Sequence, residues 1–396
     1  MDNREFDIFR ARQETPGCEK VLHFNNAGAA LMPKTVLDTM TDYLRLEAEM
    51  GGYEAAEHSR EAVQRVYESI ASLLGCGRAE VAIVENATRA WDMAFYAIPF
   101  SAGDRILTGR SEYGSNFIAF LQVARRTGAK IDVIPNDDRG QVSVPALESM
   151  IDGRVKLIAI THVPTNGGLV NPAAEIGRVA RRADIPYLLD ACQSVGQMPV
   201  DVRAVGCDLL SATGRKFLRG PRGTGFLYVR PSLLERLEPP FLDIHAAAWV
   251  SRSRFEIRAD ARRFENWETN YAGKVGLGAA VDYALEWGLE GIWVRVLKLS
   301  QSLRDRLGDI RGIQTHDLGA ERCGIVTFTV EGKASTDIRT CLAGQKMNVS
   351  ISPVEYTRLD MEERGLENVI RASVHYYNSE DEVERFCRTV EKIAAS

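Results

Sequence analysis

Long apolar runs, paired cysteines and a strong excess of charge are all missing from this sequence. No segment reaches the roughly eighteen consecutive apolar residues of a membrane span, and the opening Met1-Asp2-Asn3-Arg4-Glu5 is unlike a signal peptide. The formal net charge of -5 gives no reason to expect nucleic acid as a partner. These absences predict a cytoplasmic protein that binds neither a membrane nor nucleic acid.

Cysteine and histidine are too few and too scattered for a disulfide framework or a metal site. The seven cysteines form no CxxC pair, and the six histidines form no HExxH motif. The cysteines stand at positions 18, 76, 192, 207, 323, 341 and 387. We therefore expect reduced thiols and no bound metal.

Apolar strands alternate with helix-period segments over most of the chain, a pattern typical of a parallel sheet covered by helices. The expected strands are 81–84, 104–108, 130–134, 157–161, 186–190, 208–211 and 226–229. Helices are expected between them, for example over 115–127 and 173–183. Functional side chains should then gather in the loops that follow the carboxyl ends of the strands.

The pattern changes near residue 272 to long helices, expected over 273–287 and 292–308. The rest of the chain reads as a compact α+β unit, with strands at 324–330, 348–351 and 369–374 and helices at 336–346 and 379–395. The 396 residues, 45% of them hydrophobic, allow more than one domain. We expect a large domain over residues 20–272 and a small domain made of residues 1–19 and 273–396.

The segment 207–226 is typical of a cofactor-attachment site, with Lys216 at its centre. An apolar strand passes into Ser211-Ala212-Thr213-Gly214-Arg215-Lys216, and a glycine-rich turn leads into the next strand. The small residues let the backbone approach a bound group, and Thr213 with Arg215 can bind an anion. A lysine beside an anion site suits the covalent attachment of an aldehyde cofactor, although a lone lysine is usually a solvated surface group.

A second apolar strand, 186–190, ends in the carboxylate of Asp190. A buried Asp at a strand end is costly unless it is paired, and a protonated pyridine nitrogen would be a suitable partner. In isolation this Asp would more simply cap the next turn, but Lys216 downstream favours the cofactor interpretation. The glycine-rich run 220–225 is not a dinucleotide loop, because it precedes a strand and does not follow one.

These segments together resemble the attachment-site pattern of class V aminotransferases, which are fold type I enzymes that bind pyridoxal 5'-phosphate (PLP). The resemblance covers almost the whole chain and is closest to hercynylcysteine-sulfoxide lyases, cysteine desulfurases and isopenicillin N epimerases. It implies an α/β fold with a mostly parallel seven-stranded sheet covered by helices and a smaller α+β C-terminal domain. It also implies PLP as cofactor, an amino acid as substrate, and a homodimer with active sites at the subunit interface.

The resemblance also implies which residues contact the cofactor. Lys216 would hold PLP and later remove the Cα proton of the substrate, while Asp190 would keep the ring electron-withdrawing. The remaining cofactor contacts are implied at Gln193, Thr88, Arg89, Tyr113, Thr213, Arg215, Asn166 and Tyr271. Tyr271 belongs to the segment 267–271, which the resemblance assigns to the phosphate of the neighbouring subunit's cofactor. Thr88 would otherwise simply cap its helix.

The substrate contacts implied by the resemblance come from the two ends of the chain. Arg371, in an Arg-Ala-Ser strand, would bind the substrate carboxylate through its bidentate guanidinium. An arginine on a strand is otherwise most often a surface salt-bridge partner. Asn26 and Ala27, in the segment His23 to Ala30, would line the substrate pocket.

The reaction is less constrained than the cofactor, because members of the family differ in the chemical step after removal of the Cα proton. A cysteine desulfurase needs a nucleophilic cysteine shortly before the carboxylate arginine, and the stretch 350–356 has none. Cys341 is expected as buried packing on the 336–346 helix, and Cys192 as packing under the ring. Arg215 also stands where cysteine desulfurases usually have histidine.

The segments 24–28, 111–113, 161–172 and 348–350 most resemble a subgroup of the family that includes the hercynylcysteine-sulfoxide lyases. On this resemblance we predict a PLP-dependent C–S lyase that cleaves a cysteine-derived thioether or sulfoxide by β-elimination, giving pyruvate and ammonia. An amino-acid aminotransferase or epimerase is the alternative, and a cysteine desulfurase is less favoured. A non-catalytic PLP-binding regulator would usually carry a DNA-binding domain. The roughly twenty residues before the pocket loop leave no room for one, and both Lys216 and Asp190 are present.

Overall fold

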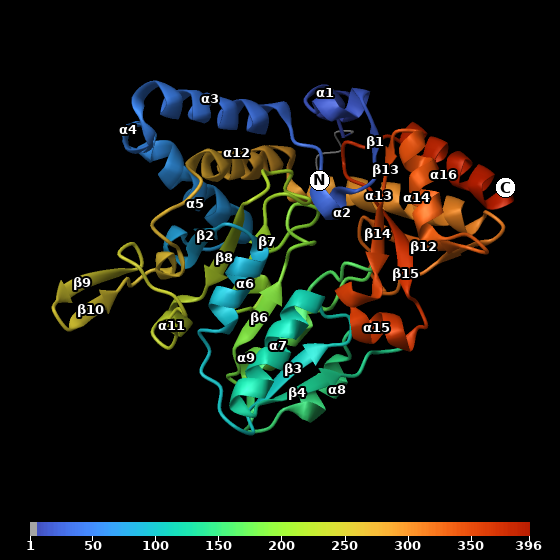
Figure 1. Cartoon of the computed structure of the whole chain (residues 1–396). Coiled ribbons are helices and arrows are strands. Elements are labelled where there is room, and N and C mark those ends of the chain that lie inside the picture. Colours follow the sequence, from blue (N-terminus) through green and yellow to red (C-terminus); the bar gives the residue numbers. More distant parts are fainter. Residues whose placement is uncertain (1–5) are drawn as a thin grey trace.

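A seven-stranded sheet forms the centre of the molecule in the computed structural model, which describes residues 6–396 (Figure 1). The strand order is β2-β8-β7-β6-β5-β3-β4, and β8 is antiparallel to both of its neighbours while the other pairs are parallel. The strands are β2 (Val81–Val84), β3 (Arg105–Gly109), β4 (Lys130–Ile134), β5 (Val155–Thr161), β6 (Tyr187–Asp190), β7 (Leu209–Thr213) and β8 (Gly225–Val229). The predicted mostly parallel seven-stranded α/β fold is confirmed.

Helices cover both faces of this sheet because side chains alternate between the faces along each strand. On β6, Leu188 packs into one apolar cluster, while Tyr187 and Leu189 pack into the other. One face is covered by α6 (Ala87–Phe95) and α7 (Gly114–Thr127). The other is covered by α5 (Arg60–Leu74), α8 (Val144–Met150), α9 (Ala173–Arg182), α10 (Val202–Val205) and α12 (Tyr271–Trp287).

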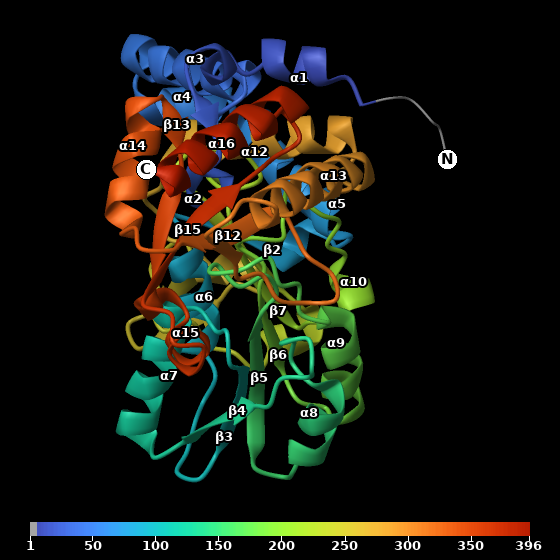
Figure 2. The ribbon, with the colours of Figure 1, turned by 90° about the vertical axis from the view of Figure 1, so that its right-hand side faces the viewer.

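The C-terminal part of the chain forms a four-stranded antiparallel sheet in the order β11-β12-β15-β14. These strands are β11 (Ile313–Thr315), β12 (Ile325–Val330), β14 (Ser350–Pro353) and β15 (Asn368–Ser373). They pack with α13 (Leu289–Gly308), α14 (Ser335–Gly344) and α16 (Glu380–Ala395) around a separate apolar core. Both views place this unit at one end of the large sheet (Figure 2).

The strand expected over 348–351 is divided between two sheets. Met347–Asn348 (β13) pairs in parallel with Leu22–His23 (β1), whereas β14 pairs with β15. The intervening Val349 is buried in the core of the C-terminal unit. The segment expected as one strand therefore pairs with two different strands, a division that its local pattern does not reveal.

Two features were not predicted from the sequence, namely a pair of helices before the first strand of the large sheet and a hairpin after its last strand. Helices α3 (Lys34–Met50) and α4 (Gly52–His58) precede α5, and α12 packs against both α3 and α5. A hairpin of β9 (Ala247–Ser251) and β10 (Arg254–Ile257) projects from the body of the molecule (Figure 1). The remaining short elements are α1 (Ile8–Gln13), η1 (Pro16–Glu19), α2 (Asn26–Ala29), η2 (Arg78–Glu80), α11 (Pro231–Leu234), η3 (Ala261–Phe264), η4 (Val354–Tyr356) and α15 (Arg358–Glu363).

The N-terminal segment packs on the C-terminal part of the chain. Arg12 forms an ion pair of 2.9 Å with Glu382, and the Phe6 ring stacks on Trp287 with centroids 4.9 Å apart. These contacts are compatible with the expected grouping of residues 1–19 with 273–396, and that division remains a prediction. Residues 1–5, including those on which the expectation of no signal peptide rests, lie outside the described residues.

Within residues 6–396, no helix combines the length and apolar composition that crossing a bilayer requires. In the same residues, no group of three or more His, Cys, Asp or Glu side chains could hold a metal ion.

Candidate active site

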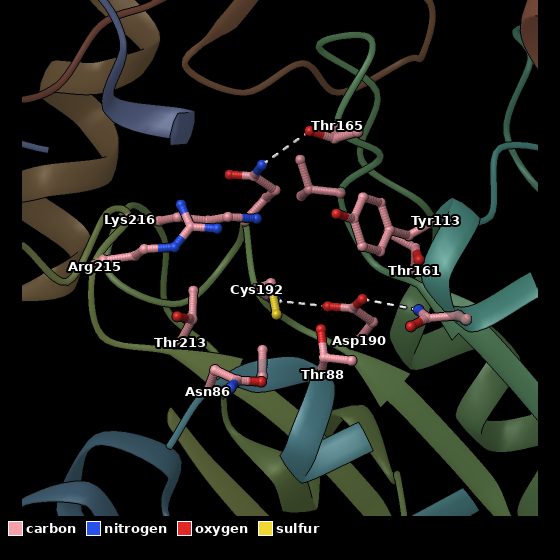
Figure 3. A pocket seen from close by; sticks show the side chains of 14 residues that line it. Asn86, Thr88, Tyr113, Thr161, Thr165, Asp190, Cys192, Thr213, Arg215 and Lys216 are labelled. Atoms are coloured by element: carbon pink, nitrogen blue, oxygen red, sulfur yellow. Dashed lines mark hydrogen bonds between the residues drawn. The ribbon is translucent and has the colours of Figure 1, made fainter. Parts of the chain in front are cut away.

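A cavity of about 430 Å³ lies beyond the carboxyl ends of β5, β6 and β7. The N-terminal ends of α6 and α7 complete its wall, as expected for a site at the strand ends of an α/β sheet. Its lining residues are Asn86, Ala87, Thr88, Tyr113, Asn116, Thr161, Val163, Thr165, Asp190, Cys192, Gln193, Thr213, Arg215 and Lys216 (Figure 3). Seven of the residues selected from the sequence meet here, namely Lys216, Asp190, Gln193, Thr88, Tyr113, Thr213 and Arg215.

Asp190 is the last residue of β6 and its carboxylate is buried in the floor of the cavity. Its Oδ1 accepts a hydrogen bond of 2.9 Å from the backbone amide of Cys192, and its Oδ2 accepts one of 2.9 Å from Nδ2 of Asn116. A carboxylate can accept about four hydrogen bonds, so these two leave capacity for a protonated ligand nitrogen.

Lys216 enters the cavity from the turn that follows β7. Burial lowers the pKa of its amine to about 8, and the nearby Arg215 guanidinium acts in the same direction. A substantial fraction of the amine is therefore neutral near physiological pH, as a nucleophile toward an aldehyde must be. The side chain lies next to that of Arg215, across the cavity from Tyr113 (Figure 3).

Polar groups suited to an anion gather where α6 begins. Asn86 caps this helix by accepting a hydrogen bond of 2.9 Å from the Arg89 amide, so the alternative in which Thr88 is the cap is not observed. Thr88 lines the cavity together with Thr213. The glycine at position 225 on β8 lets the start of α6 lie close to this strand, because a Cβ there would be only 2.6 Å from the Asn86 carbonyl carbon. A helix N-terminus with two hydroxyls nearby is suited to a phosphate.

Three residues predicted to contact the cofactor lie outside the cavity. Arg89 follows Thr88 on α6, but its guanidinium donates a hydrogen bond of 3.2 Å to Asn266 and lies 4.8 Å from the Phe241 ring centroid. Successive helical residues point about 100° apart, which explains the divergence. Asn166 lines an adjacent small hollow and donates a hydrogen bond of 3.0 Å to the carbonyl of Pro353.

Tyr271 begins α12, and its ring is stacked on Tyr43 with centroids 6.3 Å apart. It lines a separate hollow of about 310 Å³ together with Tyr53, His245 and Trp267. Because the resemblance assigns this segment to the cofactor of a neighbouring subunit, its position outside this cavity leaves that role as a prediction.

The predicted substrate contacts lie at the cavity's edge. The Nη1 atom of Arg371, on β15, donates to the hydroxyl of Thr165, a cavity residue. Gln193 donates hydrogen bonds of 3.2 Å to the Thr165 hydroxyl and to the carbonyl of Ala27. Asn26 is buried and donates a hydrogen bond of 2.7 Å to the Ser373 carbonyl, so it joins α2 to β15.

Two polar atoms at this edge are buried without a hydrogen-bond partner among the described residues. They are Nε of Arg371 and Oε1 of Gln193. Burial lowers the pKa of Arg371 to about 10, which still leaves the guanidinium charged at neutral pH. An unpaired buried cation costs free energy, and a substrate carboxylate would compensate it.

The cavity also contains residues that sequence reasoning did not select. Asn116 and Thr161 lie within segments that were singled out in the sequence, and Thr165 ranked just behind Asn166 as the expected contact in its loop. Asn116 lies in the first turn of α7, whereas Glu112 precedes the helix, so helical spacing does not identify the pair. Cys192 lies beside Asp190, and burial raises the pKa of its thiol well above the usual value.

The donor set fits PLP. A hydroxyl-rich helix N-terminus matches the phosphate, the Asp190 carboxylate matches the pyridine nitrogen, and the Lys216 amine matches the aldehyde. The Oε1 atom of Gln193, which has no hydrogen-bond partner among residues 6–396, is a further acceptor on the same wall. Tyr113 contributes an aromatic ring that could stack on the cofactor.

A family model described as Aminotransferase class-V matches residues 22–386. A probable cysteine desulfurase of Methanothermobacter thermautotrophicus is 29% identical over 393 residues, which cover 97% of each chain. Another of Xylella fastidiosa is 32% identical over 385 residues, which cover 94% of this chain and 91% of the relative. The apo structure of a cysteine desulfurase from Thermococcus onnurineus NA1 has a TM-score of 0.92 at 26% identity and covers 100% of both chains.

These similarities correct the predicted reaction. The prediction of a C–S lyase that acts by β-elimination is wrong, because the full-length relatives are named cysteine desulfurases. The alternative of an aminotransferase or epimerase has no better support. The prediction relied on the resemblance of a few short segments and on two local departures from cysteine desulfurases, the absence of cysteine from 350–356 and the arginine at position 215. The similarity to the desulfurases covers 97% of the chain.

Proposed function

The chain belongs to the class V aminotransferase family and its cofactor is PLP, and on this premise we propose that it removes the sulfur atom from L-cysteine. The main support is the similarity to probable cysteine desulfurases over nearly the full length of both chains. The cavity adds chemical support, since it combines a lysine of lowered pKa with a buried carboxylate.

The proposed reaction converts cysteine and an acceptor thiol into alanine and a persulfide. The acceptor thiolate forms a bond to the cysteine sulfur, and the Cβ–S bond breaks with its electron pair left on carbon. A proton then completes the alanine methyl group, so atoms and electrons balance without any other oxidant or reductant.

Lys216 and Asp190 are the proposed catalytic residues. When bound, the cofactor supplies an aldehyde that links covalently to amines and a ring that withdraws electrons from the substrate's Cα. Lys216 would hold the cofactor through its Nζ and, once displaced, move the Cα proton. Asp190 would keep the ring nitrogen protonated from the floor of the cavity.

The other cavity residues would bind and orient. Thr88, Thr213 and the free amides at the start of α6 would bind the phosphate, with Arg215 adding positive charge. Tyr113 would stack on the ring, and Gln193 would contact its oxygen substituent. Arg371 would bind the carboxylate of cysteine, which explains why its Nε is buried without a partner among the described residues.

We propose that the sulfur acceptor comes from outside the chain. The stretch 350–356 contains no cysteine, and the Asn166 side chain holds its backbone at Pro353. Cys192 lies in the cavity, but its raised pKa keeps the thiol protonated and poorly nucleophilic. Cys341 was expected to be buried and is instead exposed on α14, where it is not part of the cavity wall.

The subunit arrangement and location are also proposals. Apolar side chains of the β9–β10 hairpin are exposed, notably Trp249 at 75% and Phe255 at 52%, and a second copy would cover them in the expected homodimer. All seven cysteines are free thiols, which fits the reducing environment of the cytoplasm.

The product of the cysteine reaction tests the proposal. Purified holoprotein would be incubated with L-cysteine, with and without dithiothreitol as acceptor, and alanine, sulfide, pyruvate and ammonia would be measured. We expect alanine and sulfide in equal amounts, and only when dithiothreitol is present. Pyruvate with ammonia, or conversion of the cofactor to its amine form without sulfide, would refute desulfuration.

A further inference from the structure

Glu112 is a buried carboxylate directly behind the cavity, with 4% of its surface exposed. It stands between β3 and α7 and is not part of the cavity wall. Five groups direct hydrogen-bond donors at its two oxygens: the Thr108 hydroxyl, the Tyr113 amide, the Asn116 side chain, and the amide and hydroxyl of Thr161. So many donors are suited to an ionised carboxylate, which can only accept.

Asn116 connects this carboxylate to Asp190. Its Nδ2 donates one hydrogen bond of 2.8 Å to Oε1 of Glu112 and another of 2.9 Å to Oδ2 of Asp190. An amide nitrogen carries two hydrogens, so both are used. Turning the amide over would place its oxygen against two carboxylates, which makes the observed orientation strongly preferred.

We propose that Glu112 is a positioning residue for the cofactor, acting through Asn116 to hold the Asp190 carboxylate against the cofactor's ring nitrogen. Glu112 itself does not line the cavity, so its effect on the cofactor is indirect. Its charge selects the amide orientation of Asn116, and the amide fixes one oxygen of Asp190 while the Cys192 backbone amide fixes the other. Asp190 is thereby held from both sides before any ligand arrives.

The negative charge of Glu112 also affects the electrostatic potential at the cofactor's ring nitrogen. Two carboxylates separated by a single amide nitrogen make the potential at the ring nitrogen more negative than Asp190 would alone. The proton on that nitrogen is therefore held more firmly. A merely structural role, tying α7 to β3 and β5 through Thr108 and Thr161, would give stability but no such electronic effect.

The inference rests on PLP binding in this cavity and is independent of the reaction that the enzyme catalyses. Holoproteins of Glu112→Gln, Asn116→Ala and the double variant would be compared with the unaltered chain at pH 8. Burial raises the pKa of Glu112 to about 7, so the carboxylate is mostly ionised at that pH. The readouts are the absorbance maximum of the lysine-bound cofactor and the rate of cofactor release, neither of which requires turnover.

We expect both single variants to shift the absorbance maximum in the same direction and to release PLP roughly 10-fold faster, a typical effect for residues that orient a ligand-binding group. The double variant should release PLP no faster than the more affected single variant. Both changes interrupt the same series of hydrogen bonds from Glu112 through Asn116 to Asp190. With cysteine, the kcat for alanine should fall while KM changes little, because Arg371 is untouched.

Glu265→Gln is the matched control. Glu265 is equally buried at 2% exposed and accepts hydrogen bonds from Tyr67 and the Ile83 amide, but it lies outside the cavity. Its variant should lose stability without a spectral shift. The proposal is overturned if folded Glu112→Gln or Asn116→Ala keeps the original spectrum and release rate, or if their effects add as independent changes. Failure of desulfuration alone would leave these readouts intact.

Discussion

The guanidinium of Arg371 donates a hydrogen bond of 3.2 Å to the backbone carbonyl of Thr165, and also donates to the hydroxyl of the same residue. Arg371 belongs to β15 of the small sheet, whereas Thr165 follows β5 of the large sheet and lines the cavity. The edge of the candidate active site is thus shared by the two sheets. A change in how they pack would move the proposed carboxylate contact relative to Lys216.

Replacing Arg371 should weaken substrate binding. We expect Arg371→Ala to raise KM for cysteine by roughly 30-fold, since losing one partner of a buried charged contact costs about 2 kcal/mol or more. Steady-state kinetics of alanine formation would measure this. Arg371→Lys keeps the charge but loses the bidentate hydrogen-bonding geometry, so we expect a KM between those of the unaltered chain and Arg371→Ala. An unchanged KM in Arg371→Ala would exclude the carboxylate contact.

Attachment of the cofactor to Lys216 should depend on pH. The neutral amine is the reactive form, and burial lowers its pKa to about 8, so the loading rate of apoprotein should rise from pH 7 to 9 and then level off. An amine with the ordinary lysine pKa of about 10.4 would give a rate that still increases above pH 9. The absorbance band near ~420 nm reports attachment.

Lys216→Ala provides the control for that measurement. We expect no absorbance band near ~420 nm and no alanine from cysteine, because the variant has no amine at this position for the cofactor's aldehyde. The fold should persist, since removing a partly buried amine relieves desolvation. A band of unchanged intensity in the variant would mean that another lysine holds the cofactor.

The thiol of Cys192 should be dispensable for sulfur transfer. Burial raises its pKa well above the ordinary value, so we expect Cys192→Ser to keep forming alanine when dithiothreitol is supplied. Mass spectrometry of the unaltered protein after cysteine treatment should find no persulfide on this residue. Loss of alanine formation in a variant that still binds PLP would identify Cys192 as the acceptor and contradict an external thiol.

The β9–β10 hairpin should mediate self-association. Trp249 and Phe255 face each other across its two strands and are both exposed, so changing both to serine should convert a dimer into a monomer. Sedimentation equilibrium would measure the mass. Val294→Ser, which removes an apolar side chain 67% exposed on α13, should leave the mass unchanged. A dimer that survives the hairpin changes would place the interface elsewhere.

The sequence by itself determined the sheet and the chemical centre of the site. The consecutive apolar residues of β6 put apolar side chains on both faces of the sheet, so both faces must be covered by helices. The carboxyl ends of parallel strands meet at one edge of the sheet. Asp190 ends β6 and Lys216 lies in the turn after β7. Their meeting in one cavity was therefore predictable from the order of strands and turns along the chain. Their residue types suit an aldehyde cofactor with a protonated ring nitrogen, and the resemblance to class V aminotransferases implied that this cofactor is PLP.

Side-chain direction and long-range contact were decided only by the tertiary structure. Arg89 is adjacent to Thr88, yet one helical step turns it out of the cavity toward Asn266. Asn116 shows no motif of its own, because its role depends on Glu112 and Asp190 approaching from separate elements. A sequence records which residues are neighbours along the chain, whereas hydrogen bonds between distant segments exist only after packing has brought those segments together.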